Sequence, residues 1–290
     1  MRRDVDATDP SLRALLLHVE QRRARARQRL AGVAPAPAAT TDARRPAAAD
    51  GAAGREGAGS GAAVLRLERP TPDLLRVVLA RPPGFTYRAG QSVRLVLGGV
   101  RRRYTLVSAP HERDLELFVE LVPGGPMSER WRALRPGDAV GLAGAAKDGL
   151  ALAPDARRHL MLATVTGVNP FVSLLRDAVE RGRRDLGCVL VHGASYADEL
   201  GYADELAALA AARPDLLVYL PTISRPGEAR NAGWTGAQGR AEAHLDAAVA
   251  RHGLAPATTA AYACGHPAMI DGVQGRLGEL GFTVQVERYA

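Results

Sequence analysis

The sequence predicts a two-domain fold, in which an antiparallel Greek-key β-barrel is followed by a parallel α/β domain, with a disordered extension at the N-terminus. Three observations lead to this prediction. The chain has 290 residues, a length that suits about two domains. Short Val- and Leu-rich runs, many alternating with a period of two, fill residues 64–152. Beyond Pro154, strand-like and helix-like patterns alternate.

The N-terminal extension, residues 1–60, differs in composition from the rest of the chain. Residues 11–32 could form one amphipathic helix, with Asp9 or Ser11 available as its N-cap. The Ala-, Pro- and Gly-rich stretch that follows has little to bury, so we expect a disordered linker. We expect this helix to be a solvated extension, and docking on a partner or an anionic surface is the alternative.

The barrel is expected over residues 61–155. Its strands lie in three stretches that are separated by Pro- and Gly-containing turns, and their spacing is typical of a small antiparallel barrel. These stretches are residues 64–85, 91–110 and 115–125.

The α/β domain is expected over residues 156–290. Alternation of strand and helix is what a parallel sheet with crossover helices requires. The predicted strands are residues 159–165, 188–194, 216–224, 260–265 and 283–290, and the predicted helices are residues 171–182, 198–213, 241–253 and 269–281.

The net charge of +7 and the pI of about 10 raise the question of nucleic-acid binding. The basic residues are spread along the chain, Lys147 is the one lysine, and aromatic residues are not interleaved with the arginines. A nucleic-acid surface usually combines a basic cluster with aromatic stacking platforms. We therefore expect no nucleic-acid partner.

The two cysteines, Cys188 and Cys264, are too few for an iron–sulfur cluster, a zinc ribbon or a disulfide framework. No segment has the apolar length of a membrane span, and MRRDVDATDP lacks the apolar core of a signal peptide. These features predict a cytoplasmic protein without a metal site or membrane span, and we expect a monomer.

The stretch RRRYTLVSAP, residues 101–110, places arginine, tyrosine and threonine at one strand end, where a flat ligand would meet a ring, a hydroxyl and a cation. It resembles the flavin-binding strand of the ferredoxin–NADP reductase family. The resemblance implies that Tyr104 packs on the isoalloxazine, that Thr105 hydrogen-bonds near N5, and that Arg102 pairs with the flavin pyrophosphate. Leu106, Val107 and Ser108 would complete this cofactor-binding stretch. The alternative is an ordinary strand whose tyrosine caps the core.

Two further stretches resemble the flavin half of that family. FTYRAGQSVRL, residues 85–95, resembles the signature that precedes the strand leading to the flavin. GGPMSERW resembles the family's Gly-x-x-Ser/Thr through Gly125 and Ser128, with Met127 between them. Amide groups at a helix N-terminus hold phosphate well, so two phosphate sites, and hence FAD, are implied. An ordinary helix start is the alternative for Ser128.

LATVTGVNPF, residues 162–171, resembles the family's Ala-Thr-Gly-Thr-Gly-x-x-Pro nucleotide loop and implies that Thr164, Thr166 and Gly167 bind NADP(H). The sequence departs from that loop at Val165, which replaces the first glycine, and a β-branched residue there crowds a pyrophosphate and resists positive φ.

YACGHPAM, residues 262–269, resembles the family's strand-end Cys-Gly-x-Pro-x-Met. The resemblance places Cys264 beside the nicotinamide and Gly265 where the dinucleotide approaches. A buried, inert cysteine is the alternative.

Charge indicates which nicotinamide cofactor is used. Ser224 and Arg225 resemble the family's pair for the 2′-phosphate, and Arg240 resembles a further arginine of bacterial members. No carboxylate stands at these positions to bind a free ribose, so NADP(H) is favoured. Ser195 stands where some relatives carry another arginine, and Arg240 could equally be a surface residue.

The chain ends in QVERYA, which resembles bacterial reductases whose C-terminal aromatic covers the flavin. Tyr289 would lie opposite Tyr104 and would have to move for hydride transfer, and Glu287 is a candidate for moving protons. With Thr105 and Cys264, these two are our candidate catalytic residues. A frayed terminus is the alternative.

The resemblance spans roughly residues 62–290 and implies a Rossmann-like second domain. It implies an FAD-dependent oxidoreductase that moves electrons between NADPH and a one-electron carrier, ferredoxin or flavodoxin. Two alternatives stay open. One is the reductase component of an oxygenase or other electron-transfer system, and the other is a non-catalytic flavin or nucleotide sensor, which Val165 favours.

Overall fold

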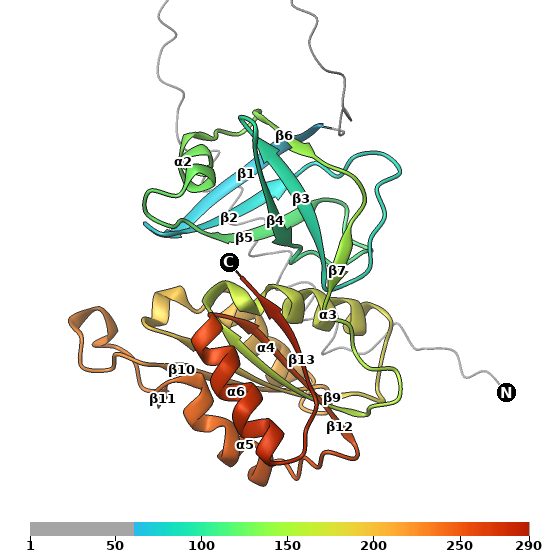
Figure 1. Cartoon of the computed structure of the whole chain (residues 1–290), viewed down its shortest axis with the longest axis vertical. Helices are drawn as coiled ribbons and strands as arrows, with labels where there is room; N and C mark the ends of the chain where they lie inside the picture. The colour runs from blue at the N-terminus through green and yellow to red at the C-terminus, as the bar shows by residue number, and fades with distance from the viewer. Residues whose placement is uncertain (1–60, 290) are drawn as a thin grey trace, which may run out of the picture. The chain divides into compact units, whose positions relative to one another are not determined.

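Two sheets make up most of the computed structural model, which describes residues 61–289 (Figure 1). The first is a seven-stranded antiparallel sheet and the second a six-stranded parallel sheet. The predicted fold class is confirmed. The helix predicted over residues 11–32 and the linker after it lie outside the described residues.

The barrel sheet has the strand order β4-β3-β6-β1-β2-β5, with β7 added to β3. β6 lies between β3 and β1 rather than beside β5, as in a Greek key. The barrel closes beyond β4, where the Val107 amide donates to the Glu116 carbonyl at 2.8 Å. Its elements are β1 (Gly61–Thr71), β2 (Leu74–Leu79), β3 (Gln91–Leu97), β4 (Val100–Thr105), β5 (Leu115–Glu120), α2 (Pro126–Ala133), β6 (Ala139–Leu142) and β7 (Lys147–Gly149).

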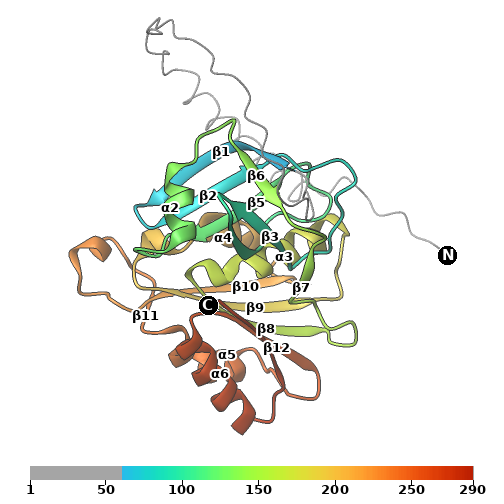
Figure 2. The same ribbon diagram turned by 45° about the horizontal axis from the view of Figure 1, so that its top comes forward.

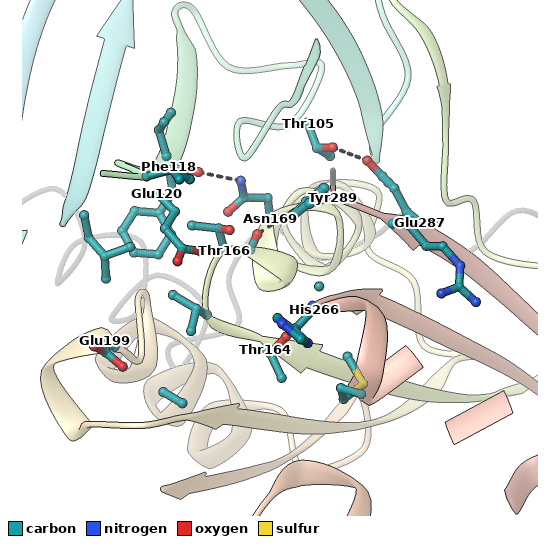
Figure 3. A pocket seen from close by; sticks show the side chains of 18 of the residues that line it. Thr105, Phe118, Glu120, Thr164, Thr166, Asn169, Glu199, His266, Glu287 and Tyr289 are labelled. Carbon is teal, nitrogen blue, oxygen red and sulfur yellow. Dashed lines mark hydrogen bonds between the residues drawn. The ribbon is translucent and has the colours of Figure 1, made fainter. Parts of the chain in front are cut away.

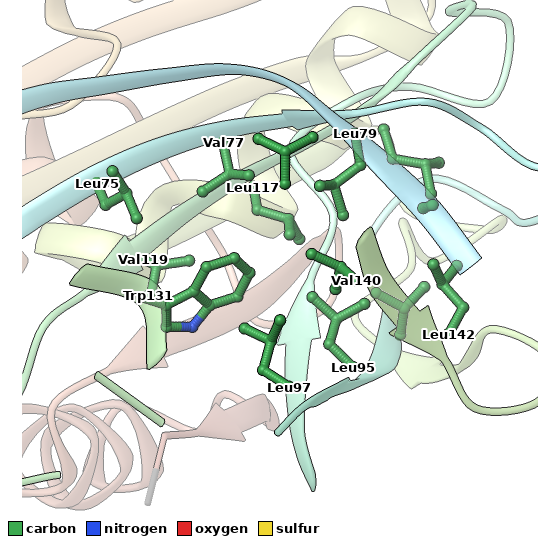
Figure 4. Close-up of a cluster of buried hydrophobic side chains, with 14 of the residues drawn as sticks. Leu75, Val77, Leu79, Leu95, Leu97, Leu117, Val119, Trp131, Val140 and Leu142 are labelled. Carbon is green, nitrogen blue, oxygen red and sulfur yellow. The ribbon is translucent and has the colours of Figure 1, made fainter. Parts of the chain in front are cut away.

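Alternate residues of the barrel strands fill its core (Figure 4). Leu75, Val77 and Leu79 of β2 point inward and are fully buried, as the period of two in the sequence requires. Trp131 of α2 is also fully buried and closes the core from the side of the helix. The interior of the barrel is therefore filled by its own side chains.

The parallel sheet has the strand order β11-β10-β9-β8-β12-β13. Figures 1 and 2 show α3 and α4 on the face toward the barrel, and α5 and α6 on the opposite face. The chain order reverses between β8 and β12, and ligands bind at such a switch point in open α/β sheets. The elements are β8 (Arg158–Thr164), η1 (Val165–Val168), α3 (Asn169–Glu180), β9 (Gly187–Ala194), η2 (Ala197–Glu199), α4 (Ala203–Ala212), β10 (Leu217–Ile223), η3 (Ala229–Asn231), β11 (Ala237–Gln238), η4 (Ala241–His244), α5 (Leu245–Arg251), β12 (Thr259–Gly265), α6 (Pro267–Glu279) and β13 (Val284–Arg288).

Two of the predicted helices begin later in the structure. The helix predicted from residue 198 begins at Ala203, because Tyr202 before it adopts the left-handed conformation with φ of 63°. The helix predicted from residue 241 starts as a 3₁₀ turn and becomes α-helical at Leu245. Strands β6, β7 and β11 are short and were not singled out by their sequence pattern.

Helix α3 and the start of α4 hold the α/β half against the barrel. The Ser173 hydroxyl donates to the Ser108 carbonyl at 2.8 Å and accepts from the Gly90 amide at 3.2 Å. Arg176 lies 2.8 Å from the Glu116 carboxylate of the barrel and 2.7 Å from Glu205 of α4. These contacts fix how the two halves enclose the space between them.

Tyr202 lies between two guanidinium groups at this interface. The Arg76 guanidinium is 4.3 Å from the centre of the ring, and that of Arg176 is 5.4 Å from it. The Tyr202 hydroxyl donates to Glu116 at 3.1 Å. The left-handed turn before α4 therefore has a structural purpose, since it places this ring between the barrel and α3.

Candidate functional site

A cavity of about 1500 Å³ lies where the barrel meets the carboxyl ends of the parallel strands (Figure 3). The barrel contributes the ends of β4 and β5 and the N-terminus of α2. The α/β half contributes residues at the ends of β8 and β12, Thr164 and Gly265, and the C-terminal strand. The cavity is thus at the switch point of the sheet, where the topology predicts a ligand.

The barrel wall of the cavity carries Tyr104 in a fixed orientation. Its ring packs edge-on against Trp131, with ring centroids 5.5 Å apart, and its hydroxyl accepts a hydrogen bond of 2.8 Å from the Trp131 indole. Burial raises the pKa of the Tyr104 phenol. Arg102, two residues earlier on the same face, is exposed and also lines the cavity. An aromatic wall and a cation are therefore adjacent, as a flavin with its phosphates requires.

Helix α2 begins at the cavity. Gly125 is its N-cap, and no side chain caps this helix end. A Cβ on Gly125 would lie only 3.1 Å from the Ser128 hydroxyl, so the glycine lets the chain pack closely here. Gly125, Met127 and Ser128 all line the cavity. The N-terminal amide groups of an uncapped helix favour an anion, so phosphate fits this corner.

The C-terminal strand β13 supplies the opposite wall. Its Glu287 carboxylate accepts a hydrogen bond from the Thr105 hydroxyl of the barrel (Figure 3). Tyr289 is half-buried, and its hydroxyl donates to the Thr166 carbonyl at 3.4 Å. Burial, with the Cys264 and Glu287 groups beside it, raises the pKa of Tyr289 well above its usual range. The final residues are therefore held in the cavity wall by hydrogen bonds to both halves.

Cys264 is fully buried at the end of β12 and does not line the cavity. Burial raises the pKa of its thiol, first by desolvation and then through Glu287. A thiol that stays protonated is a poor nucleophile, so covalent chemistry at Cys264 is not favoured. The Tyr289 side chain lies against this thiol.

The loop after β8 interlocks with the end of β12. A Cβ on Gly167 would lie 2.1 Å from the Cys264 carbonyl, and one on Gly265 would lie 2.1 Å from the Thr164 hydroxyl. The Thr164 hydroxyl accepts a hydrogen bond of 2.9 Å from the His266 amide. These glycines are thus required by the close approach of the two loops, in addition to any room they leave for a dinucleotide.

A second cationic region lies on the β10 side of the cavity. Arg225 donates to the Tyr196 hydroxyl at 3.1 Å and lies 3.3 Å from Glu228, which also accepts from Tyr196 at 2.5 Å. Arg240 is 75% exposed and lies 3.9 Å from Glu242. Cations and hydroxyls that gather at a surface cavity suit a phosphate monoester.

Most of the residues predicted from the sequence come together around this one cavity. Five do not line it, because neighbouring parts of the chain cover them. Leu106, Val107 and Ser108 are fully buried in the barrel, where Ser108 bonds Tyr87, while Gly167 and Cys264 are covered by neighbouring backbone and side chains. The predicted residues that line the cavity are Arg102, Tyr104, Thr105, Gly125, Met127, Ser128, Thr164, Thr166, Ser224, Arg225, Arg240, Gly265, Glu287 and Tyr289.

Several polar residues that line the cavity were not predicted from the sequence, among them Asn169, Glu120 and His266. Asn169 donates to the Phe118 carbonyl at 2.8 Å, joining α3 to β5 (Figure 3). Burial, reinforced by Glu199, raises the pKa of Glu120. Asn169 and His266 occupy positions written x in the two nucleotide motifs. Their place inside a motif was the one sequence feature that could have identified them. Glu120 gave none, because it ends an ordinary strand.

Residues 61–289 hold no group of three or more His, Cys, Asp or Glu side chains that could bind a metal. Among these same residues, no helix combines the length and hydropathy needed to cross a membrane. The donor set of the cavity is instead that of an anion site in two parts. Arg102 and the α2 N-terminus form one part, and Ser224, Arg225 and Arg240 form the other. Two phosphorylated ligands fit this arrangement better than one.

Comparison with known proteins agrees with this arrangement. Residues 161–275 match the family model of the oxidoreductase NAD-binding domain. The chain is 36% identical over 223 residues to ferredoxin–NADP reductase B of Sorangium cellulosum, covering 71% of this chain and 86% of that protein. It is 36% identical over 136 residues to the flavodoxin/ferredoxin–NADP reductase of Shigella flexneri, which is 45% of this chain and 54% of that protein. The match thus spans about half the length of this second relative.

One solved structure is similar to this chain over both the barrel and the α/β half. The ferredoxin NADP⁺ reductase of Neisseria gonorrhoeae, solved with bound FAD and NADP, superposes with a TM-score of 0.70 at 28% identity. The superposition covers 80% of this chain and 99% of that one. On its sequence, its two-sheet fold and the cavity between the sheets, the chain belongs to the ferredoxin–NADP reductase family.

Proposed function

We propose that the protein is an FAD-dependent reductase that moves electrons between NADPH and a small one-electron carrier, ferredoxin or flavodoxin. The observation that carries this proposal is the single cavity shared by the two halves of the fold. Its barrel wall offers an aromatic ring and an anion site, and its α/β wall offers a second anion site and the switch point of the sheet. NADPH and FAD would meet between these walls.

On this proposal, the barrel residues hold the flavin. The Tyr104 ring, held in place by Trp131, would cover one face of the isoalloxazine and exclude water from it. Arg102 and the uncapped start of α2 would hold the pyrophosphate. When bound, FAD would supply the ability to take up a hydride and release its electrons singly. The similarity to a reductase solved with FAD supports this assignment.

Thr105 and Glu287 would manage the proton at the reacting edge. The Thr105 hydroxyl donates its proton to the Glu287 carboxylate. Its oxygen is therefore oriented to accept a hydrogen bond from a donor group bound in the cavity. Glu287 belongs to the C-terminal strand and lines the cavity, so it can exchange a proton with a group bound there.

Tyr289 would act as a movable cover. Its hydroxyl makes a long and therefore weak hydrogen bond of 3.4 Å to the Thr166 carbonyl, and it also contacts the Thr105 and Cys264 side chains. Displacement of this ring would open the space between Thr105 and Cys264 to the nicotinamide.

The electron carrier would dock on the basic edge of the barrel. Arg94 of β3 lies directly opposite Arg103 of β4, and Arg101 stands two residues along on the same face. All three are exposed, and Arg103 also lines the cavity. An acidic protein would be steered to this edge, within a short distance of the flavin site.

We also propose, as predicted from the sequence, that the protein is a cytoplasmic monomer.

An anaerobic titration of the purified protein tests the proposal. We expect a yellow protein whose flavin absorbance is bleached by NADPH at lower concentration than by NADH, and which then reduces ferredoxin or flavodoxin. A protein that stays colourless when FAD is added would rule the proposal out. Bleaching without reduction of either carrier would indicate another electron-transfer partner, such as an oxygenase component, and a bound flavin that NADPH fails to bleach would indicate a sensor.

A further inference from the structure

Val165 has a strained backbone at the centre of the nucleotide loop. Its φ is 45°, and it is one of two non-glycine residues with positive φ among residues 61–289. The left-handed region brings Cβ of a β-branched residue close to the following carbonyl oxygen, so valine adopts it only under constraint. Val165 directly follows β8 and lines the cavity. Something in the surrounding structure must therefore hold this turn.

A buried imidazole on the neighbouring strand contacts this turn. His192 of β9 is fully buried, and its Nε2 lies 3.2 Å from the Val165 carbonyl oxygen. Its Nδ1 lies 3.1 Å from the Tyr219 hydroxyl of β10. His192 of β9 thus connects the Val165 carbonyl, which directly follows β8, with Tyr219 of β10. The three strands are neighbours in the sheet.

For a neutral imidazole, only one proton arrangement satisfies all of these groups. A carbonyl oxygen can only accept, so Nε2 must carry the proton and donate it to Val165. Nδ1 is then an acceptor, and the Tyr219 hydroxyl donates to it. Burial lowers the pKa of His192 to about 4, so the ring stays neutral at physiological pH and keeps this arrangement.

We propose that His192 is a positioning residue, oriented by Tyr219, that holds the Val165 carbonyl and thereby keeps the nucleotide loop in the shape that binds NADP(H). This inference rests on the proposed function, because it assigns NADP(H) to that loop. It explains how the chain carries a valine where its left-handed turn favours glycine. Glycine adopts such a turn without strain, so the imidazole bond would then matter much less.

Packing of the Val165 side chain is the competing explanation. The side chain lies against a small apolar cluster of Ala194, Leu200 and Ile223. If this packing alone held the turn, loss of the imidazole bond would have no effect on the loop. The two explanations therefore predict different results when changes at residues 165 and 192 are combined.

The test is a double-mutant cycle of His192→Phe and Val165→Gly in the FAD-loaded protein. We expect His192→Phe to raise the KM for NADPH and the Kd for NADP⁺ by about tenfold, the value of one lost hydrogen bond, with kcat and flavin content nearly unchanged. In the Val165→Gly background, His192→Phe should raise this KM and this Kd by less than about twofold. In the apoprotein, the shift of the urea midpoint that His192→Phe causes should likewise be smaller when residue 165 is glycine.

Two further variants keep the test decisive. His192→Gln retains a donor for the Val165 carbonyl and should stay close to wild type in KM. Tyr219→Phe removes only the hydroxyl that orients the imidazole, so it serves if His192→Phe does not fold, and it should raise KM by about threefold in the valine background only. The matched control is Tyr262→Phe. Tyr262 bonds the buried His159 at 3.2 Å in the same sheet but does not line the cavity, so KM should not change.

An equal rise of KM in both backgrounds, or no rise in either, would overturn the proposal. An equal rise in the Tyr262→Phe control would do so as well, because any buried tyrosine would then have the same effect. Failure of the proposed function looks different, since the wild-type protein would then show no flavin difference spectrum with NADP⁺. In that case the coupling of the urea midpoints still tests whether His192 holds the turn.

Discussion

The Thr105 hydroxyl donates a hydrogen bond to the Glu287 carboxylate, joining the last residue of β4 to the C-terminal strand. The two residues are 182 positions apart in the chain and come from the two halves of the fold. Glu287 reaches this position because β13 pairs with β12, which places it opposite Cys264. The pair closes the wall between Tyr104 and Tyr289 on the cavity.

Removal of the Glu287 carboxylate should slow flavin reduction by NADPH. We expect Glu287→Ala to lower the rate by about 100-fold, because the hydrogen-bond acceptor that orients Thr105 at the reacting edge is lost, and Glu287→Gln to lower it by about tenfold, because an acceptor oxygen remains without its charge. Stopped-flow absorbance at the flavin band measures both rates. An alanine variant that reduces its flavin at the wild-type rate would show that Glu287 has no part in the reaction.

Glu228 should weaken the binding of NADPH. Its carboxylate pairs with Arg225 and accepts from Tyr196, so a 2′-phosphate must displace it. Because the pair is exposed, its loss is worth little, and we expect Glu228→Gln to lower the KM for NADPH by about threefold while leaving that for NADH unchanged. Glu279→Gln, which removes a similar i,i+3 partner from Arg276 on α6, is the control. A parallel fall in both KM values would show that Glu228 acts on the dinucleotide in general.

The ion cluster at Arg176 should be essential for stability. Arg176 is 13% exposed and contacts Glu112, Glu116 and Glu205, so Arg176→Met would leave these carboxylates facing one another. We expect a loss of about 3–5 kcal/mol in the free energy of unfolding. Arg181→Met removes a 63% exposed partner of Asp177 at the C-terminal end of the same helix and should leave the urea midpoint nearly unchanged. Urea denaturation compares the two, and similar midpoints would contradict the prediction.

Stability should fall as the pH is lowered from 6.5 toward 4. Burial lowers the pKa of both His159 and His192 to about 4, so between these values the unfolded chain binds more protons than the folded protein. The stabilisation is complete above pH 6.5 and, for His192, amounts to about 3 kcal/mol, which is lost as the pH falls through 4.

Urea midpoints at several pH values between 7 and 4 measure this loss. His159→Gln carries no titrating group and keeps an oxygen that can accept from Tyr262, so its midpoint should fall less steeply with acid. Equal slopes for this variant and the wild type would show that His159 is not a source of the acid sensitivity.

Much of the fold was predictable because it depends on local pattern. The period of two in LLRVVL and the alternation of strands with helices after Pro154 are dictated by which residues must face a core. Helix starts were less predictable, since the left-handed turn at Tyr202 depends on Arg76 and Arg176, which are distant in sequence.

The candidate site shows the same division. The motifs around Tyr104, Ser128 and Thr164 indicated which residues gather at the cavity, because each motif contains its own turn or helix start. They gave no sign of Glu120 or of the Glu228 carboxylate beside Arg225, whose positions depend on contacts between segments.

The sequence by itself determined two architectures, the chemical groups available to a ligand, and the unusual valine of the nucleotide loop. Only the tertiary structure decided that Glu287 meets Thr105, that Cys264 is covered, and that His192 bonds the Val165 carbonyl. The physical reason is the separation along the chain over which each kind of interaction acts. Periodicity and turn chemistry act over a few neighbouring residues, whereas hydrogen bonds between strands and ion pairs between domains exist only after the chain has packed.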